Sequence, residues 1–302
     1  MARFINPFTD IGFKRIFGQE ISKPVLIAFL NALLDGERRI ADVQYLDKEQ
    51  PAESVDDRSL IYDVYCKLDN GEHIIVEMQN KSQAFFKNRS VYYISRSISR
   101  QGDPGKDWHY DVKAVYIIAL LNFHRDDISR EFRTDVALMD MRHKTLFSDK
   151  MRLIFLQLPY FTKELGECET LFEKLIYVLK HMDVLQRMPW LAQDAVFQKL
   201  ASIADVASLN KKERIAYDEN LRKYRDTIVV MEGQYQEGME KGLAKGRAEG
   251  HAEGRAEGRA EGHAEGRAEA LTENARRMKA KGFSAEDIAE ITGLSVDDVA
   301  QL

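Results

Sequence analysis

The sequence predicts a mixed α/β core that is followed by a helical region and a long glycine-repeat helical tail. Three observations predict this order. Apolar and β-branched runs alternate with helix-period segments up to about residue 160, apolar residues recur at helical spacing from 165 to about 230, and glycine occupies every fourth position from 238 to 266. With 302 residues, of which 44% are hydrophobic, the chain can bury a core and has room for roughly two domains.

The first element is a helix over residues 22–36, with Ser22 as N-cap and Gly36 just beyond its end. Leu26, Phe29, Leu30 and Leu33 share one face, so this helix packs on a core. Six runs are strand candidates: Ile40–Leu46, Leu60–Leu68, His73–Gln79, Val112–Leu121, Phe132–Met139 and Leu153–Leu158. A helix-period segment, 84–101, separates the third run from the fourth.

The segment from 165 to about 230 carries two apolar stripes at helical spacing. These are Leu171, Leu175, Val178 and Leu179, and then Val196, Leu200 and Ile203. Such stripes usually pack into a core. We divide the chain into a core over 1–160, a helical subdomain over 161–232, a tetrad-repeat helix over 233–270 and a small C-terminal helical unit over 271–302.

The repeat from 246 onward is Gly-(Arg/His)-Ala-Glu. On a helix its basic and acidic stripes lie on nearly opposite sides, and each glycine costs about 1 kcal/mol of helix propensity relative to alanine. An isolated helix of this kind is marginal, whereas a second chain that sets its basic stripe against the acidic one stabilises both. We therefore expect a homo-oligomer joined through this repeat helix, with a solvated spacer as the alternative.

The last unit, 271–302, resembles a helix-turn-helix in its spacing. Gly282 ends one helix, Ser284 with Asp287 forms a cap for the next, and Ser295 opens the last. The would-be recognition helix carries Asp297 and Asp298 and no lysine or arginine. Because carboxylates repel phosphates, base reading by this unit is not favoured.

Charge and cysteine content limit the setting of the protein. The net charge of −5 argues against coating nucleic acid by charge alone, although a local basic site is compatible with it. Two distant cysteines form neither a disulfide framework nor a metal knuckle. No apolar run approaches the ~18 residues of a spanning helix, so we expect no membrane partner and a cytoplasmic setting.

The most informative stretch, 60–80, is a predicted β-hairpin around Asp69-Asn70-Gly71. A two-residue loop would place Asp63 and Glu77 on opposite faces, whereas a three-residue loop with Gly71 in the left-handed position pairs them. The second register also gives a cleaner apolar face and sets Gln79 beside the two acids. Two facing carboxylates suit a hard divalent cation, and an ordinary amphipathic hairpin with surface acids is the alternative.

The helix after this hairpin reverses the overall charge of the chain. It carries five basic residues and no acid between 81 and 101, and Arg89, Tyr93, Arg96 and Arg100 fall on one face. Val91, Ile94 and Ile98 lie opposite and are expected to pack inward. An arginine stripe with an interleaved tyrosine suits phosphates and exposed bases, and a solvated charged face is the alternative.

Asp63, followed after a hairpin by Glu77-Met78-Gln79, resembles the PD-(D/E)xK nuclease superfamily. With the segment Asn6–Phe17 (NPFTDIGFKRIF) and the basic helix, the chain looks like the recombination-promoting nuclease / putative transposase family. The resemblance covers roughly residues 3–230. It implies a restriction-endonuclease-like core, a mixed sheet flanked by helices, and a role in recombination or transposition.

Carried over by position, the resemblance gives roles to single residues. Asp63 and Glu77 hold Mg²⁺ with the Met78 carbonyl as third ligand, and Gln79 stands where the superfamily often has lysine. Asp10 matches an upstream acid that completes many such sites, and Lys14 follows it by one turn. Gln79 can orient a water but carries no charge. Lys14, Lys67 and Lys81 are candidates to replace that charge, and His73 shares the site face.

Three functions follow as hypotheses. The first is a Mg²⁺-dependent DNA endonuclease in which activated water attacks a phosphodiester. The second is a nuclease-fold protein that binds DNA and oligomerises but has weak or no catalysis. The third is a regulatory partner that acts through its helical tail.

Overall fold

The computed structural model describes residues 2–50, 60–102 and 109–302. By their internal contacts they form two compact units, 1–229 and 230–302. The eight α-helices of the described residues are α1 (Asp10–Phe17), α2 (Lys23–Leu33), α3 (Phe86–Ser99), α4 (Leu171–His181), α5 (Ala195–Ala204), α6 (Lys211–Ala280), α7 (Ala285–Thr292) and α8 (Val296–Gln301). The finer division at residues 160, 232 and 270 stays a prediction.

The first unit is built on a six-stranded mixed sheet in the order β1-β4-β5-β6-β8-β7. Its strands are β1 (Val43–Tyr45), β4 (Val64–Leu68), β5 (His73–Gln79), β6 (Val115–Leu121), β7 (Arg133–Met139) and β8 (Leu146–Gln157), and β2 (Glu49–Gln50) with β3 (Leu60–Ile61) forms a separate pair. β5, β6 and β8 run parallel, and the other neighbours in the sheet pair antiparallel. This mixed sheet flanked by helices confirms the predicted fold class.

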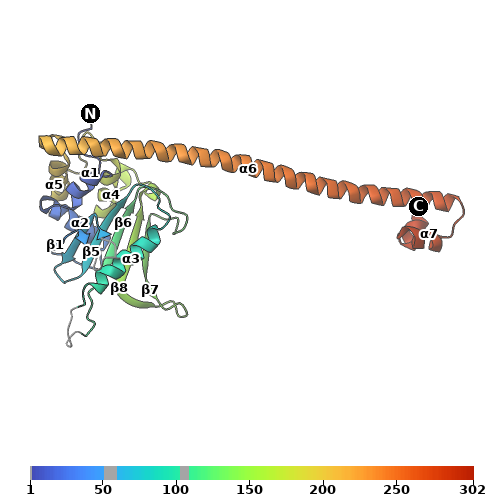
Figure 1. Cartoon of the computed structure of the whole chain (residues 1–302), viewed down its shortest axis with the longest axis horizontal. Coiled ribbons are helices and arrows are strands. Elements are labelled where there is room, and N and C mark those ends of the chain that lie inside the picture. The colour runs from blue at the N-terminus through green and yellow to red at the C-terminus, as the bar shows by residue number, and fades with distance from the viewer. Residues whose placement is uncertain (1, 51–59, 103–108) are drawn as a thin grey trace, which may run out of the picture. The chain divides into compact units, whose positions relative to one another are not determined.

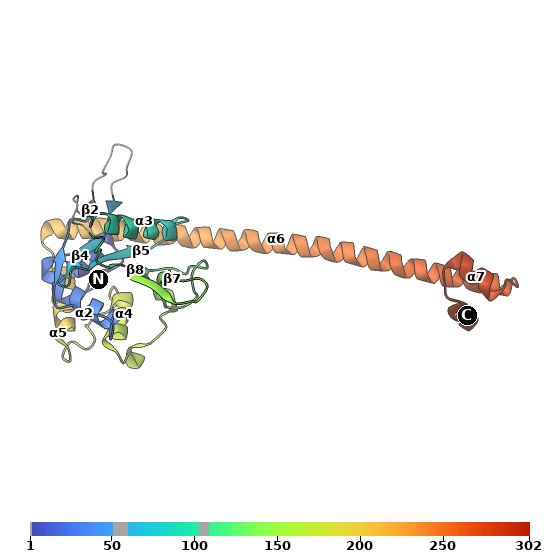
Figure 2. The same ribbon diagram turned by 90° about the horizontal axis from the view of Figure 1, so that it is seen from below.

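Both faces of the sheet are covered, as Figure 2 shows with α3 on one side and α2 and α4 on the other. The larger core lies under α1, α2, α4, α5 and the first turns of α6, and it takes Val64 and Val76 from the hairpin. The smaller core lies under α3 and takes Tyr65 and Ile75. We expected only one apolar face on this hairpin, and that expectation was wrong because its two strands lie inside the sheet.

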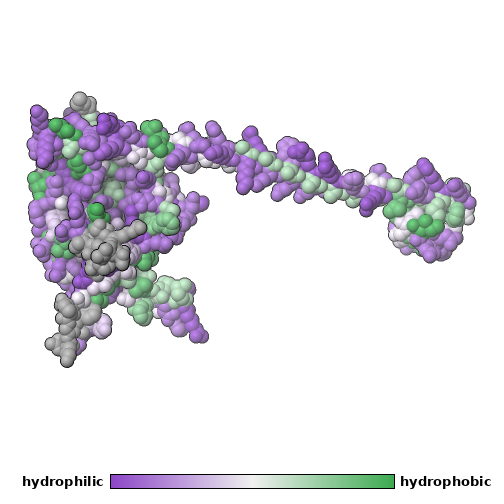
Figure 3. All heavy atoms as spheres, in the orientation of Figure 1, coloured by the Kyte–Doolittle hydropathy of each residue, from purple (hydrophilic) through white to green (hydrophobic). Residues whose placement is uncertain are grey.

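The predicted elements are found, with shifts at their ends. The run Leu60–Leu68 is split into β3 and β4, with Asp63 at the bend between them. Ser22 occupies the N-cap position of α2, but its hydroxyl bonds Gln19 instead of capping the helix. β8 begins seven residues before the predicted Leu153. The hairpin joining it to β7 projects from the sheet (Figure 1), and its apolar side chains are exposed (Figure 3), so no burial pattern marks this part of β8.

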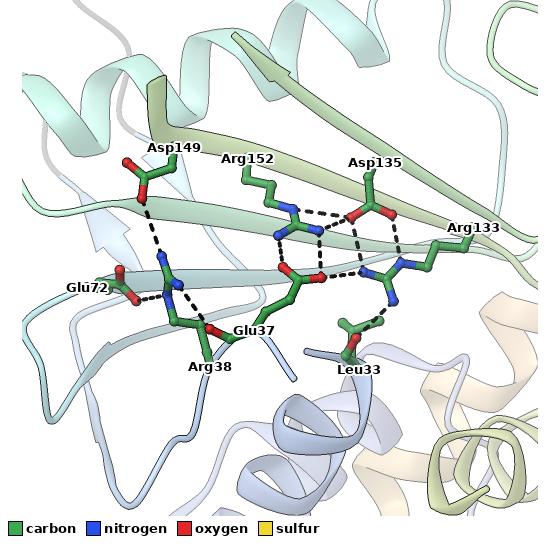
Figure 4. A network of polar contacts seen from close by, with 8 residues as sticks. All are labelled: Leu33, Glu37, Arg38, Glu72, Arg133, Asp135, Asp149 and Arg152. Atoms are coloured by element: carbon green, nitrogen blue, oxygen red, sulfur yellow. Dashed lines mark hydrogen bonds and ion pairs between the residues drawn. The ribbon is translucent and has the colours of Figure 1, made fainter. Parts of the chain in front are cut away.

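A network of ion pairs fixes the end of α2 to the sheet (Figure 4). Arg152 of β8 bonds both Glu37 and Asp135, while Arg133 of β7 donates to Asp135 at 2.7 Å and to the Leu33 carbonyl at 2.9 Å. Arg152 lies three pairs along the strands from the level of Glu77, toward their amino-terminal ends. Arg133 lies at the level of Met78, but the network is on β7 and β8, and β6 separates these strands from β5, which carries Glu77.

In the second unit, the glycine repeat is helical throughout and belongs to α6. A methyl group added at any repeat glycine would meet nothing within 4 Å. At the C-terminus, Ser284 and Ser295 cap α7 and α8 as expected, and Ala275, Ile288 and Val299 form a small core. Among the helices of the described ranges, none combines the length and apolar character that crossing a membrane requires.

Candidate active site

The hairpin register brings Asp63 and Glu77 opposite each other. Val64 pairs with Val76, and the loop closes with a 2.8 Å bond from the Leu68 N–H to the Glu72 carbonyl. Gly71 takes the left-handed conformation, with φ of 86°. This is the predicted three-residue loop, and continuing its register places Asp63 across from Glu77.

Short polar contacts hold the two carboxylates in place. The Met78 N–H donates to Asp63 Oδ2 at 2.8 Å, and the Asp63 N–H donates to Glu77 Oε1 at 3.4 Å. Gln79 Nε2 donates to Glu77 Oε2 at 3.4 Å. Asp63, Glu77 and Gln79 thus form one cluster at the bend between β3 and β4.

The pKa values of both acids are raised. Glu77 is only 6% exposed. Burial first, and then the charge of Asp63, raise the pKa of Glu77 to about 8. Burial also raises the pKa of Asp63, while the Met78 N–H and Lys14 act in the opposite direction. A buried and a half-buried carboxylate that repel each other are stabilised by a cation placed between them.

The available donors suit a hard divalent cation, which prefers oxygen ligands. Two side chains supply carboxylate oxygens, and the backbone of Met78 is the predicted third ligand. Across the described residues, no three His, Cys, Asp or Glu side chains gather into a metal site by themselves. A cation here therefore depends on backbone, amide or water oxygens to complete its shell.

Asp10 and Lys14 come from the first turns of α1, which Thr9 caps by accepting from the Gly12 N–H. They pair with each other at 2.5 Å. Both act electrostatically on Asp63, since Lys14 lowers its pKa and Asp10 raises it. The loop before α1 is held next to the site because Asn80, directly after Gln79, donates to the Phe8 carbonyl at 2.6 Å.

The stripe on α3 lies beside the core, and its four residues are half-buried: Arg89, Tyr93, Arg96 and Arg100. Phe86, Ser90, Ile94 and Ser97 form the buried face of the helix. Val91 is 52% exposed, so the expectation that it packs inward was wrong. The two serines take the inward positions because they admit the sheet closely, as the 3.0 Å contact between Ser97 Oγ and the Tyr65 hydroxyl shows.

Alternation along the strands assigns Lys67 and His73 to the same face as the two acids. Both lie at the end of the hairpin that is remote from Asp63 and Glu77. Lys67 pairs with His73, four residues before Glu77. The ring of His73 packs on Tyr65 and contacts Gln101 at 3.4 Å, and burial followed by Lys67 lowers its pKa. Lys81 is exposed at the start of the next loop. Alternation along a strand identifies the face but not the distance along it.

Three polar residues beside the site were not predicted: Asn80, Asn122 and Arg125. Asn122 follows β6 as Asn80 follows β5, and its side chain reaches Asn80 at 3.5 Å and the Tyr224 hydroxyl of α6 at 3.3 Å. A usable signal existed, because polar residues at the carboxyl ends of adjacent parallel strands gather at one edge of a sheet. Arg125 is the third, and it bonds Asp127 through two 2.7 Å contacts.

The fold and the paired acids define a nuclease-like α/β domain. A family model described as PD-(D/E)XK nuclease family transposase matches residues 7–234, and the chain belongs to that family. This confirms the resemblance drawn from the sequence and supports a nuclease or transposase-like function with a DNA substrate. No match was found among curated proteins or among solved structures.

Proposed function

We propose that the protein is a Mg²⁺-dependent DNA endonuclease that acts in recombination or transposition. The observation that carries the proposal is the facing pair of half-buried Asp63 and buried Glu77, both with raised pKa values, in a chain of this family. Without a cation, the repulsion within such a pair lowers the stability of the fold. With a cation bound, the pair can take part in catalysis.

In this proposal Asp63, Glu77 and the Met78 carbonyl hold the ion. When bound, Mg²⁺ supplies Lewis-acid chemistry at the scissile phosphate and favours ionisation of the attacking water. Gln79 lies within hydrogen-bonding distance of Glu77 and orients that water through its amide. Asp10 and Lys14 form the outer rim of the site, where Lys14 offsets part of the negative charge at Asp63.

DNA reaches the site along α3. Arg89, Arg96 and Arg100 bind backbone phosphates, and Tyr93 offers a ring for stacking on a base. The tail links copies of the chain into a homo-oligomer through the repeat helix, so two sites act on one DNA. The protein works in the cytoplasm.

The test is cleavage of supercoiled plasmid. We expect nicking by the wild type with Mg²⁺, no nicking with EDTA, and loss of activity in Asp63→Ala and Glu77→Ala. Circular dichroism is the control that both variants remain folded. Undiminished cleavage by either folded variant would exclude this site.

Gln79 supports a second candidate, a DNA-binding oligomer with little or no catalysis. A neutral amide stands where the superfamily often carries lysine, which removes a charge from the site. DNA binding without metal-dependent nicking would favour this candidate. If the protein neither binds nor cleaves DNA, the third hypothesis remains, in which it is a regulatory partner that acts through its helical tail.

A further inference from the structure

Phosphodiester hydrolysis is accelerated by a positive group near the scissile phosphate, in addition to the ion that the acids hold. Negative charge builds on the phosphate oxygens as water attacks, and a fixed cation that meets this charge contributes strongly to the rate. Gln79 supplies none.

Arg89 is joined to the strand of the first acid through aromatic rings. Its guanidinium packs on the Tyr93 ring, and that ring packs on Tyr62, which directly precedes Asp63. Lys14 acts on Asp63 but is paired with Asp10 at 2.5 Å. Arg89 is the fourth residue of α3 and lies one turn before Tyr93.

The guanidinium of Arg89 is held from three directions. Nη1 donates to Gln83 Oε1 at 2.6 Å, and Cζ lies 5.6 Å from the Phe86 ring centroid and 5.7 Å from that of Tyr93. The Tyr93 ring in turn meets Tyr62 edge-on at 5.2 Å, and Tyr62 directly precedes Asp63. The cation is thus tied to the backbone that carries the first acid.

A second arginine fixes the residue that holds Arg89. Arg125 Nη1 donates to the Gln83 carbonyl at 3.0 Å, and Arg125 is itself clamped by Asp127. The Arg125 side chain is only 5% exposed, which makes it a rigid support. Gln83 is therefore held through its backbone by Arg125 and holds Arg89 through its side chain.

We propose that Arg89 is a catalytic residue that takes the place of the missing lysine, with Gln83 as its positioning residue. This inference rests on the proposed nuclease function. The guanidinium binds a non-bridging oxygen of the scissile phosphate and stabilises its growing negative charge. The water oxygen bonds to phosphorus, the bond from phosphorus to one sugar oxygen breaks, the attacking water loses a proton, and the leaving oxygen gains one.

The test places a positive charge at position 79, where the superfamily often has lysine. Arg89→Ala is expected to lower the single-turnover rate at saturating DNA by about 10²–10³-fold. The double variant Gln79→Lys/Arg89→Ala is expected to recover at least about tenfold of that loss. Arg130→Ala removes an exposed arginine that pairs with Asp126, and it serves as the matched control with an unchanged rate. Arg96→Ala is expected to weaken DNA binding more than it lowers the saturated rate.

A double-mutant cycle separates positioning from folding. If Gln83 acts through Arg89, Gln83→Ala lowers the rate in the wild type and has little further effect in Arg89→Ala. A purely structural role for Gln83 gives additive losses instead.

A readout without catalysis keeps this inference separate from the proposed function. A positive charge beside the ion weakens metal binding, so Mn²⁺ affinity by calorimetry should rise about tenfold in Arg89→Ala and fall again in the double variant. If the wild type never cleaves but these affinities change, the nuclease function fails and Arg89 remains the charge at the site. Unchanged affinities, or no recovery by lysine in a cleaving enzyme, would overturn the inference.

Discussion

Replacing Glu77 with glutamine should stabilise the metal-free protein at pH 8 and change it little at pH 5. In the folded chain, burial and the nearby Asp63 raise the pKa of Glu77 from 4.5 to about 8. An acid with a raised folded pKa favours folding while it is protonated, and this contribution is lost as pH rises from 4.5 through 8. The wild type should therefore lose stability over this range.

The magnitude follows from the linkage between pKa and stability. Each unit of pKa shift corresponds to about 1.4 kcal/mol, so the loss between pH 5 and pH 8 is roughly 3 kcal/mol for this one group. In a folded unit of this size that corresponds to a difference of about 6–12 °C in Tm. Glutamine keeps the shape, and its single amide oxygen accepts from the Asp63 N–H as Glu77 Oε1 does. Its NH2 group replaces Glu77 Oε2 and donates to the Gln79 amide oxygen once that amide is turned over, and the side chain cannot ionise.

The assay is thermal unfolding by circular dichroism in EDTA at the two pH values. Glu131→Gln, which changes an exposed glutamate, is the control for losing one negative charge. We expect the Tm of the wild type to fall relative to Glu77→Gln on going to pH 8, while Glu131→Gln follows the wild type. The same pH dependence in wild type and Glu77→Gln would refute the burial argument.

Three further predictions test the motif, the stripe and the tail. Gly12→Ala should destabilise the protein by about 3 kcal/mol, because the added methyl would lie 2.0 Å from the Asn6 carbonyl oxygen. Gly166→Ala is the control, since its added methyl meets nothing within 4 Å. Equal denaturation midpoints for the two variants would contradict this prediction. Replacing Arg96 and Arg100 together by alanine should lower the salt slope of DNA binding by about 2 on any sequence, measured by fluorescence anisotropy, and an unchanged slope would mean a solvated stripe. Truncation after Val229 should lower the number of chains per particle, measured by light scattering, and preserve cleavage, since Tyr217 and Tyr224 remain. An unchanged number of chains per particle would make the tail a spacer.

The part of the site that the sequence predicts is the part made by local geometry. Asp63 and Glu77 lie 14 residues apart in one hairpin, and the choice of loop is governed by Gly71, whose φ of 86° suits glycine. Alternation then assigns every side chain of the hairpin to a face. It does not reveal that α3 covers the second face, because packing of α3 depends on where the chain returns after Gln79.

The contacts that sequence patterns do not reveal join distant segments. Asn122 and Tyr224 are 102 positions apart, and Asn80 and Phe8 are 72 apart. Helical period placed Ile94 and Ile98 correctly but misplaced Val91, which is more hydrophobic than Ser90 and yet is exposed. At the two serine positions, small side-chain size at a close approach outweighed hydrophobicity.

The segment Asn6–Phe17 owes most of its pattern to folding. Asn6 Oδ1 accepts from the Phe8 N–H at 2.8 Å, Thr9 caps α1, and Gly12 leaves no room for a side chain against the Asn6 carbonyl. These contacts make a rigid turn that Asn80 binds to the end of β5. The consequence is that α1 is held at a fixed place, from which Asp10 and Lys14 act electrostatically on Asp63. The segment is therefore remote from Asp63 in sequence and yet contributes to its electrostatic surroundings.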